Sequence, residues 1–170
     1  DPFNLAIGAG IELPTGQTDY QDKQNKYPGF LQTGSGSYDP ILEVGAHTIR
    51  GKHWFSGHLM YKLTTQGELG NQDFEKPDIF KYNLGYAYAL SKLFDLQLEL
   101  NGQLKSKAKL EGTKKDNTGG HMLYLTPGVH FKFHKGMHLD LCTPIPVYRD
   151  LNGEHVSEDY RIVAKLAFKF

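Results

Sequence analysis

Apolar and polar residues alternate with a period of two over most of the chain. The clearest example is residues 93–104, where Phe94, Leu96, Leu98 and Leu100 alternate with acidic and amide side chains such as Asp95. A strand places the two sets on opposite faces, whereas a helix would mix them around its circumference. This stretch therefore predicts a strand with one apolar and one polar face.

The same alternation recurs along the chain, so that the sequence predicts eight antiparallel strands. They cover residues 3–13, 38–49, 54–63, 80–90, 93–104, 123–133, 137–148 and 160–170. Pro127, Pro144 and Pro146 lack the N–H donor that a central strand needs, so we expect bulges or local fraying at these positions. Residues 137–148 are nevertheless expected to form one strand, with Tyr148 on the same face as Asp140.

The predicted connections alternate between short and long. Residues 50–53, 91–92 and 134–136 form tight turns, while residues 15–37, 66–77, 105–120 and 149–158 are long and polar. Short turns at one end and long loops at the other are typical of bacterial outer-membrane barrels, in which both termini lie at the periplasmic end. The expected fold is one domain over residues 1–170, an antiparallel up-and-down transmembrane β-barrel of a Gram-negative outer membrane.

The alternation alone also fits a soluble barrel that keeps its apolar face inside, as lipocalins do. Aromatic residues near the strand ends favour the membrane alternative, because such barrels carry aromatic girdles at both interfaces. The residues expected at the lipid interface are Phe55, Tyr82, Phe131, Phe133, Tyr160, Phe168 and Phe170. The chain also ends on an aromatic residue at the close of an alternating strand, as outer-membrane proteins with a C-terminal assembly signal do.

The opposite face carries charges of both signs, which can pair across neighbouring strands if they are enclosed. In lipid, each Lys or Arg near the bilayer centre would cost roughly 2–4 kcal/mol, so this face is expected to point into the barrel. The residues expected to line the lumen are Glu43, Lys62, Asp95, Glu99, His130, Lys132, Asp140 and Arg161.

Composition narrows the function without identifying it. The 19 basic and 19 acidic side chains balance, which gives no support to a nucleic-acid partner. No run approaches the roughly 18 apolar residues of a membrane helix. The single cysteine, Cys142, excludes an internal disulfide, and no motif indicates a cofactor or a metal site.

Two groups of residues invite a catalytic interpretation, although interior packing is favoured for both. His138, Asp140 and Cys142 share one face, but same-face neighbours on a strand stand roughly 6.5–7 Å apart, too far for a direct hydrogen bond. Ser56 and His58 resemble the histidine and serine of lipid A deacylases. In those enzymes, however, the catalytic pair faces the membrane, so we predict no enzymatic activity.

Several turn and strand-end motifs resemble a known family. Leu13-Pro14-Thr15-Gly16, Gly34-Ser35-Gly36 with Asp39-Pro40, and residues 146–153 (Pro-Val-Tyr-Arg-Asp-Leu-Asn-Gly) are similar to the outer-membrane transporter family labelled "putative MetA pathway of phenol degradation". The resemblance implies a channel-like barrel associated with uptake of hydrophobic or aromatic compounds. Family members are generally longer, so the chain is either the C-terminal part of a larger barrel or an eight-stranded relative whose interior is filled by side chains.

The expected function is a passive, porin-like channel or transporter for small hydrophobic or aromatic compounds. The alternative is a closed structural barrel that serves as a membrane anchor or as a subunit of an envelope complex. The expected partners are outer-membrane lipids and lipopolysaccharide, the barrel-assembly machinery through the strand ending at Phe170, and an envelope-complex partner. Lys105, Lys107 and Lys109 continue the inward phase, where they would line the mouth or meet lipopolysaccharide phosphates.

Overall fold

The computed structural model describes residues 3–19, 32–69, 72–133, 136–155 and 158–168. Within these ranges the regular structure consists of β-strands. No helix there is long and apolar enough to span a membrane. The antiparallel β architecture predicted from the alternation is confirmed.

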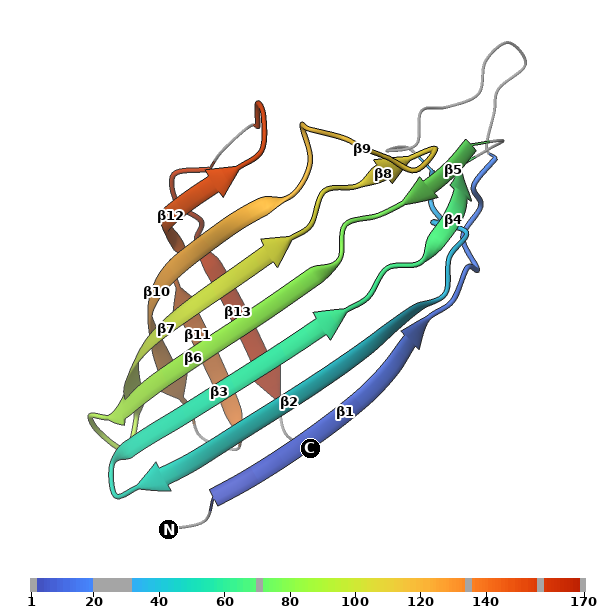
Figure 1. The fold of residues 1–170 in the computed structure, drawn as a ribbon. Coiled ribbons are helices and arrows are strands. Elements are labelled where there is room, and N and C mark those ends of the chain that lie inside the picture. The colour runs from blue at the N-terminus through green and yellow to red at the C-terminus, as the bar shows by residue number, and fades with distance from the viewer. Residues whose placement is uncertain (1–2, 20–31, 70–71, 134–135, 156–157, 169–170) are drawn as a thin grey trace.

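One large antiparallel sheet of nine strands forms most of the molecule (Figure 1). Its neighbouring strands follow the order β1-β2-β3-β6-β7-β10-β11-β13, and β12 also pairs with β10. The strands are β1 (Phe3–Glu12), β2 (Asp39–Arg50), β3 (His53–Lys62), β6 (Ile79–Ala89), β7 (Phe94–Lys105), β10 (Gly120–Lys132), β11 (Met137–Cys142), β12 (Ile145–Leu151) and β13 (Val163–Phe168).

A second, four-stranded sheet stands at the end of the molecule opposite the tight turns (Figure 1). It contains β4 (Gln66–Leu69), β5 (Gln72–Glu75), β8 (Lys109–Leu110) and β9 (Thr113–Lys114). These residues belong to two connections that the sequence predicts as plain polar loops, so that prediction is incomplete. The two connections join through β5 and β8, where Phe74 is in register with Leu110.

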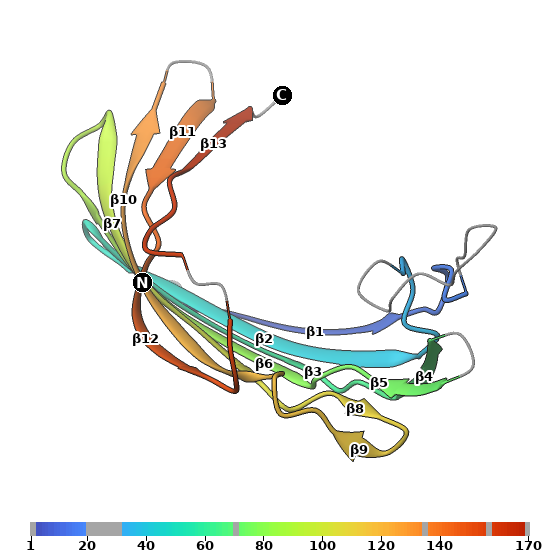
Figure 2. The same cartoon turned by 90° about the horizontal axis from the view of Figure 1, so that it is seen from above.

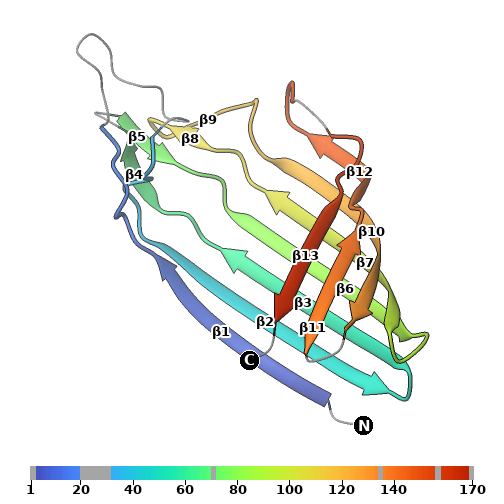
Figure 3. The ribbon, with the colours of Figure 1, turned by 180° about the vertical axis from the view of Figure 1, so that it is seen from behind.

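The large sheet is strongly curved and open. Seen from above, β11 and β13 stand over the concave side of the wall that begins with β1, β2 and β3 (Figure 2), and the view from behind places them in front of β3 and β6 (Figure 3). Among the described residues, β1 pairs only with β2, and β13 only with β11. The predicted closed barrel is therefore observed as a curved, unclosed wall. As predicted, β1 begins and β13 ends at the tight-turn end (Figure 1).

All eight predicted strands are present, but the seventh is broken. Residues 137–148 do not form one strand, because β11 ends at Cys142 and β12 begins at Ile145. Pro144 lies in the break, where its missing N–H cannot complete a ladder. Both halves pair with the same strand, β11 with Gly128–Lys132 and β12 with Gly120–Leu125.

A register shift beside this break changes the face of one residue. The β10–β12 pairing shifts between Leu123 and Tyr124, which brings Tyr148 into register with Leu123 on the apolar face. The ring of Tyr148 accordingly contacts His121 there, with centroids 5.1 Å apart. The predicted inward orientation of Tyr148 is wrong, because a bulge in β12 between Pro146 and Tyr148 inverts the alternation of faces.

Most of the deeply buried residues lie near the long-loop end, although Thr126 within β10 is also nearly fully buried. Asp39 is fully buried, and Ser35, Ser37, Thr64 and Ala108 are nearly so. The chain approaches itself closely here: a Cβ on Gly34 would stand 2.2 Å from the carbonyl oxygen of Gly16. The glycines of the Leu-Pro-Thr-Gly and Gly-Ser-Gly motifs thus allow two segments of the first long connection to touch.

Candidate functional site

The polar face of the large sheet is the candidate site. Antiparallel register aligns polar residues of successive strands into rows, one of which runs through His58, Asn83, Asn101 and Tyr124. The Arg161 guanidinium lies over the ring of Tyr124, and its Cζ stands 5.9 Å from the ring centroid. The segment carrying Arg161 crosses the concave side of the sheet (Figure 2). The polar face is therefore the concave one, and we call it the inner face.

Seven of the eight residues predicted to line a lumen lie in strands on the inner face. They are Glu43, Lys62, Asp95, Glu99, His130, Lys132 and Asp140. The eighth, Arg161, precedes β13 and pairs with Glu158, whose carboxylate also accepts a hydrogen bond from the Tyr124 hydroxyl. The structure brings these residues to one face, and their contact with a permeating molecule stays a prediction.

Ion pairs cross the inner face near the tight-turn end. Lys132 donates a hydrogen bond to Asp95 at 2.6 Å, and His130 pairs with Asp140. The His138 ring lies beside His130, with centroids 5.4 Å apart. These contacts join β7, β10 and β11, which is the cross-strand pairing that the mixed charge predicts.

A second charged cluster lies at the long-loop end of the inner face. Lys62 donates a hydrogen bond to Glu12, and its Nζ stands 3.5 Å from Oδ2 of Asp39. Asp39 is completely buried, and its other oxygen accepts a hydrogen bond from the Thr65 N–H at 3.0 Å. Lys62 thus provides the positive charge that compensates a buried carboxylate.

Amide and hydroxyl groups occupy the middle of the inner face. Asn101 receives a hydrogen bond from Asn83 and donates at 3.1 Å to the buried hydroxyl of Thr126. Asn101 also donates to the Glu99 carboxylate at 3.3 Å. These side-chain hydrogen bonds join β6, β7 and β10 in addition to the backbone hydrogen bonds of the sheet.

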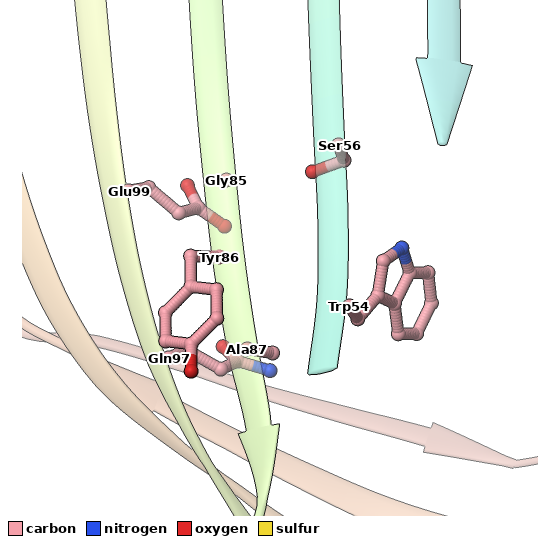
Figure 4. Close-up of a pocket in the computed structure, with 7 residues that line it drawn as sticks. All are labelled: Trp54, Ser56, Gly85, Tyr86, Ala87, Gln97 and Glu99. Carbon is pink, nitrogen blue, oxygen red and sulfur yellow. The ribbon is translucent and has the colours of Figure 1, made fainter. Parts of the chain in front are cut away.

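A hollow of about 150 Å³ lies on the inner face between β3, β6 and β7 (Figure 4). Trp54 and Ser56 border it on β3, while Gln97 and Glu99 border it on β7. Periodicity places these side chains on one face but does not predict the hollow, because the hollow depends on the register of three strands. Trp54, the only tryptophan of the chain, is not among the residues that the sequence singles out.

The opposite, convex face carries the aromatic residues predicted for a lipid interface. Phe55, Tyr82, Phe131 and Phe168 lie in strands on this face, in register with other apolar or aromatic positions. Phe133 and Tyr160 lie outside the strands and are 45% and 66% exposed. Phe170 lies outside the described residues.

Aromatic side chains form two belts on the convex face, one at each end of the strands. The belt at the tight-turn end consists of His53, Phe55, Tyr86, Tyr88, Phe94 and Phe131. The other consists of Tyr61, Phe80, Tyr82, His121 and Tyr148. Tyr61 follows His53 by eight residues on β3, so at about 3.3 Å per residue and a tilt of roughly 40° the outer members of the two belts stand about 20 Å apart.

In the two groups considered for catalysis, the printed contacts of the histidine or aspartate run to a neighbouring strand: Nε2 of His58 stands 3.3 Å from Oε2 of Glu43 on β2. The partner of Asp140 is His130 on the neighbouring strand rather than His138 or Cys142 of its own strand. The Ser56 hydroxyl stands over Gly85, where a Cβ would lie 2.4 Å from it. In the described part of the chain, no three His, Cys, Asp or Glu side chains converge on a metal position.

The lysines that follow β7 pair with acidic residues of the long connections. Lys107 donates a hydrogen bond to Asp116 at 2.7 Å, and Lys109 donates to Glu75 at 2.8 Å. Hydrogen bonding to Lys107 lowers the pKa of the Asp116 carboxyl, and hydrogen bonding to Glu75 raises the pKa of Lys109. Both lysines therefore contact acidic side chains of this protein. Their contact with lipopolysaccharide phosphates stays a prediction.

Comparison with known proteins gives solved structures of similar fold and one family. The fold resembles the crystal structure of an outer membrane channel from Pseudomonas putida F1, with a TM-score of 0.67 and 13% sequence identity over 96% of this chain. The alignment covers 58% of that channel, so the chain spans less than two thirds of its relative's length. No curated protein matches in sequence. The family described as "Putative MetA-pathway of phenol degradation" matches residues 1–145, and the chain belongs to this family.

Proposed function

We propose that the chain forms part of the wall of an outer-membrane channel that passes small aromatic or otherwise hydrophobic molecules passively. The family described for phenol degradation and the structural relative, an outer membrane channel, both support this proposal. The single observation that carries it is the distribution of charge, since the concave face holds the ion pairs and the convex face holds the exposed apolar side chains.

The convex face has the chemistry of a surface in contact with lipid. Ile7 is 80% exposed and Leu84 58% exposed, together with Leu5, Leu42 and Leu98 on the same face. A soluble protein rarely exposes a continuous apolar surface larger than a few hundred Å². Acyl chains would cover this surface, and the two aromatic belts would lie at the interfaces.

The open edges of the sheet support a complete wall that contains more strands. In the hydrocarbon region, each unpaired backbone N–H or C=O costs several kcal/mol. The outer edges of β1 and β13 are unpaired among the described residues. Further strands that pair with these edges would enclose a wider lumen than eight strands do, and a wider lumen favours transport over a packed interior.

Planar bilayer recordings of the reconstituted full-length protein test the proposal. We expect discrete conductance steps, and a shift in reversal potential under a salt gradient when Lys81 on the inner face is replaced by Glu. Lys114→Glu, the same change on exposed β9, serves as the matched control and should shift the reversal potential much less. Absence of conductance from correctly folded protein would refute the channel and favour the closed barrel that serves as an anchor.

A further inference from the structure

Two hollows adjoin on the inner face of the wall. The first, of about 520 Å³, spans β3, β6, β7 and β10, and its inward side chains are His58, Lys81, Asn83, Asn101, Gln103 and Tyr124. The second, of about 330 Å³, lies towards the long-loop end, where Gln103, Lys105 and Met122 border it together with residues of the long connections. Gln103 borders both hollows, and volumes of this size are typical of sites for small organic ligands.

Two lysines of these hollows lie close together. Lys81 is in register with Gln103, and Lys105 follows Gln103 by two residues on the same face of β7. Diagonal neighbours of this kind on adjacent strands stand about 7–8 Å apart. Both lie towards the long-loop end of the wall, because Lys81 stands near the start of β6 and Lys105 ends β7 (Figure 1). Two ammonium groups on flexible stems can therefore approach one point above Gln103.

Neither of these two lysines has an anionic partner among the described residues. Both side chains are exposed, and no ion pair in that part of the chain joins them to a carboxylate. Other carboxylates of the inner face are engaged elsewhere. Glu12 and Asp39 contact Lys62, and Oε2 of Glu43 stands 3.3 Å from Nε2 of His58. The two unpaired positive charges repel each other, so an anion from outside the chain would stabilise them.

The surroundings of the two lysines favour a carboxylate with an apolar tail. The Gln103 amide makes no side-chain hydrogen bond within the described ranges, so its N–H groups can donate to an anion. Met60 lies beside Lys81 in register, and Met122 lies beside Gln103, so apolar surface flanks the polar groups on both sides. The described residues that border the hollows include no arginine fork and no helix N-terminus, which are the groups that commonly bind phosphate.

We infer that Lys81, Lys105 and Gln103 form a binding site for the carboxylate of a small organic acid, whose alkyl chain lies against Met60 and Met122. The carboxylate accepts hydrogen bonds from both ammonium groups, at the roughly 2.7–2.9 Å of charge-assisted contacts, and from the amide. This inference rests on the proposed channel, in which the inner face meets passing solutes. It adds a preference for amphiphilic anions to that function.

Hexanoate is a suitable probe because it joins a carboxylate to a short apolar chain. The full-length protein in detergent micelles is titrated near neutral pH, where the probe is ionised, with hexanoate labelled in its carboxyl carbon. We expect saturable broadening of the carboxyl NMR signal, which an excess of unlabelled hexanoate reverses. Hexanol and hexylammonium keep the chain without the negative charge, and inorganic phosphate keeps the charge without the chain. Each should compete at least about tenfold more weakly.

Variants of the two lysines test the charged contacts. Lys81→Met and Lys105→Met each remove one ammonium group and should weaken hexanoate binding about tenfold, since hydrogen bonds between charged groups are the stronger ones. Lys114→Met, the same change on exposed β9, should bind hexanoate as the unmodified protein does. Heat-modifiable gel migration verifies that each variant is folded.

A variant of Gln103 tests the position of the site. Gln103→Glu places a carboxylate of the chain itself between the two lysines and should abolish saturable binding. Gln97→Glu is the matched control, because Gln97 lies on the same face of β7, six residues away. At about 3.3 Å per residue the two positions stand about 20 Å apart, where salt largely screens the added charge.

The outcomes separate this inference from the proposed function. Broadening that unlabelled hexanoate does not reverse, equal affinities of Lys81→Met and Lys114→Met, or hexanol or phosphate competing as well as hexanoate would each overturn the carboxylate site. If the same preparations conduct ions in bilayers, the channel stands while this site is lost. Saturable hexanoate binding without conductance would retain the site and remove the channel.

Discussion

Lys62 compensates a buried carboxylate, and its removal should destabilise the protein strongly. Its ammonium pairs with Glu12 and stands 3.5 Å from Oδ2 of Asp39, which is completely buried. Lys62→Met keeps most of the side-chain volume but leaves Asp39 without a counter-charge. Loss of one partner from a buried ion pair costs about 3–5 kcal/mol, because the remaining charge stays desolvated. We expect the free energy of unfolding to fall by about this amount.

Removing the buried carboxylate of Asp39 as well should restore part of the stability lost in Lys62→Met. Asp39→Asn removes the buried charge but keeps the oxygen that accepts the Thr65 N–H at 3.0 Å. The double variant Lys62→Met/Asp39→Asn should therefore recover more than half of the loss, leaving mainly the partly exposed Glu12 without its cation.

Urea unfolding in lipid vesicles, followed by the emission of Trp54, measures these differences. Lys81→Met is the matched control, since Lys81 lies on the same face and the structure shows no ion pair for it among the described residues. Its effect should stay within about 0.5 kcal/mol. A loss below about 1 kcal/mol for Lys62→Met, or a double variant no more stable than the single one, would refute the argument from the buried charge.

Three further predictions follow from contacts on the two faces and in the long connections. Gly102→Ala should cost about 1–3 kcal/mol in urea unfolding, because its Cβ would stand 1.9 Å from the Tyr82 ring, while Gly10→Ala, whose Cβ has a nearest neighbour at 4.0 Å, should be nearly neutral. Cys142 on the inner face should react with a hydrophilic thiol reagent in vesicles, whereas a cysteine moved to Leu141 on the convex face should be protected by lipid; equal labelling of the two would reverse the assignment of the faces. Lys107→Gln should raise the pKa of Asp116 towards its usual value in an NMR titration, because Lys107 now lowers it. The contribution of this exposed pair to stability is present above the ordinary aspartate pKa and disappears as the pH falls through the lowered value. If the pKa of Asp116 does not change in Lys107→Gln, the contact between the two side chains is contradicted.

The sequence predicts the strands and their faces because both follow from a local period of two. Asp95 and Leu96 fall on opposite faces in the structure as their alternation indicates. Periodicity does not reveal the bulge in β12, and so Tyr148 is predicted on the wrong face. The pairing of β5 with β8 joins residues far apart in sequence, which no local pattern specifies.

The candidate site shows the same division between local and long-range information. The predicted lumen residues are identified by charge on the polar face, which local alternation supplies. The burial of Asp39 and the hollow beside Trp54 depend instead on contacts between strands and connections that meet only after folding. Small residues such as Gly85 and Ala87 carry no chemical signal of their own, so the space above them becomes visible only in the structure.

The short distance between the two aromatic belts restricts the lipids that suit this protein. A separation of about 20 Å is well below the roughly 30 Å hydrocarbon thickness of an average bilayer, and bacterial outer membranes are thinner than average. Each ångström of mismatch costs a fraction of a kcal/mol, so thick, sterol-rich membranes should disfavour insertion. Short-chain phosphatidylcholines are accordingly the suitable host for reconstitution, and bilayer thickness itself would help to sort this wall into its proper membrane.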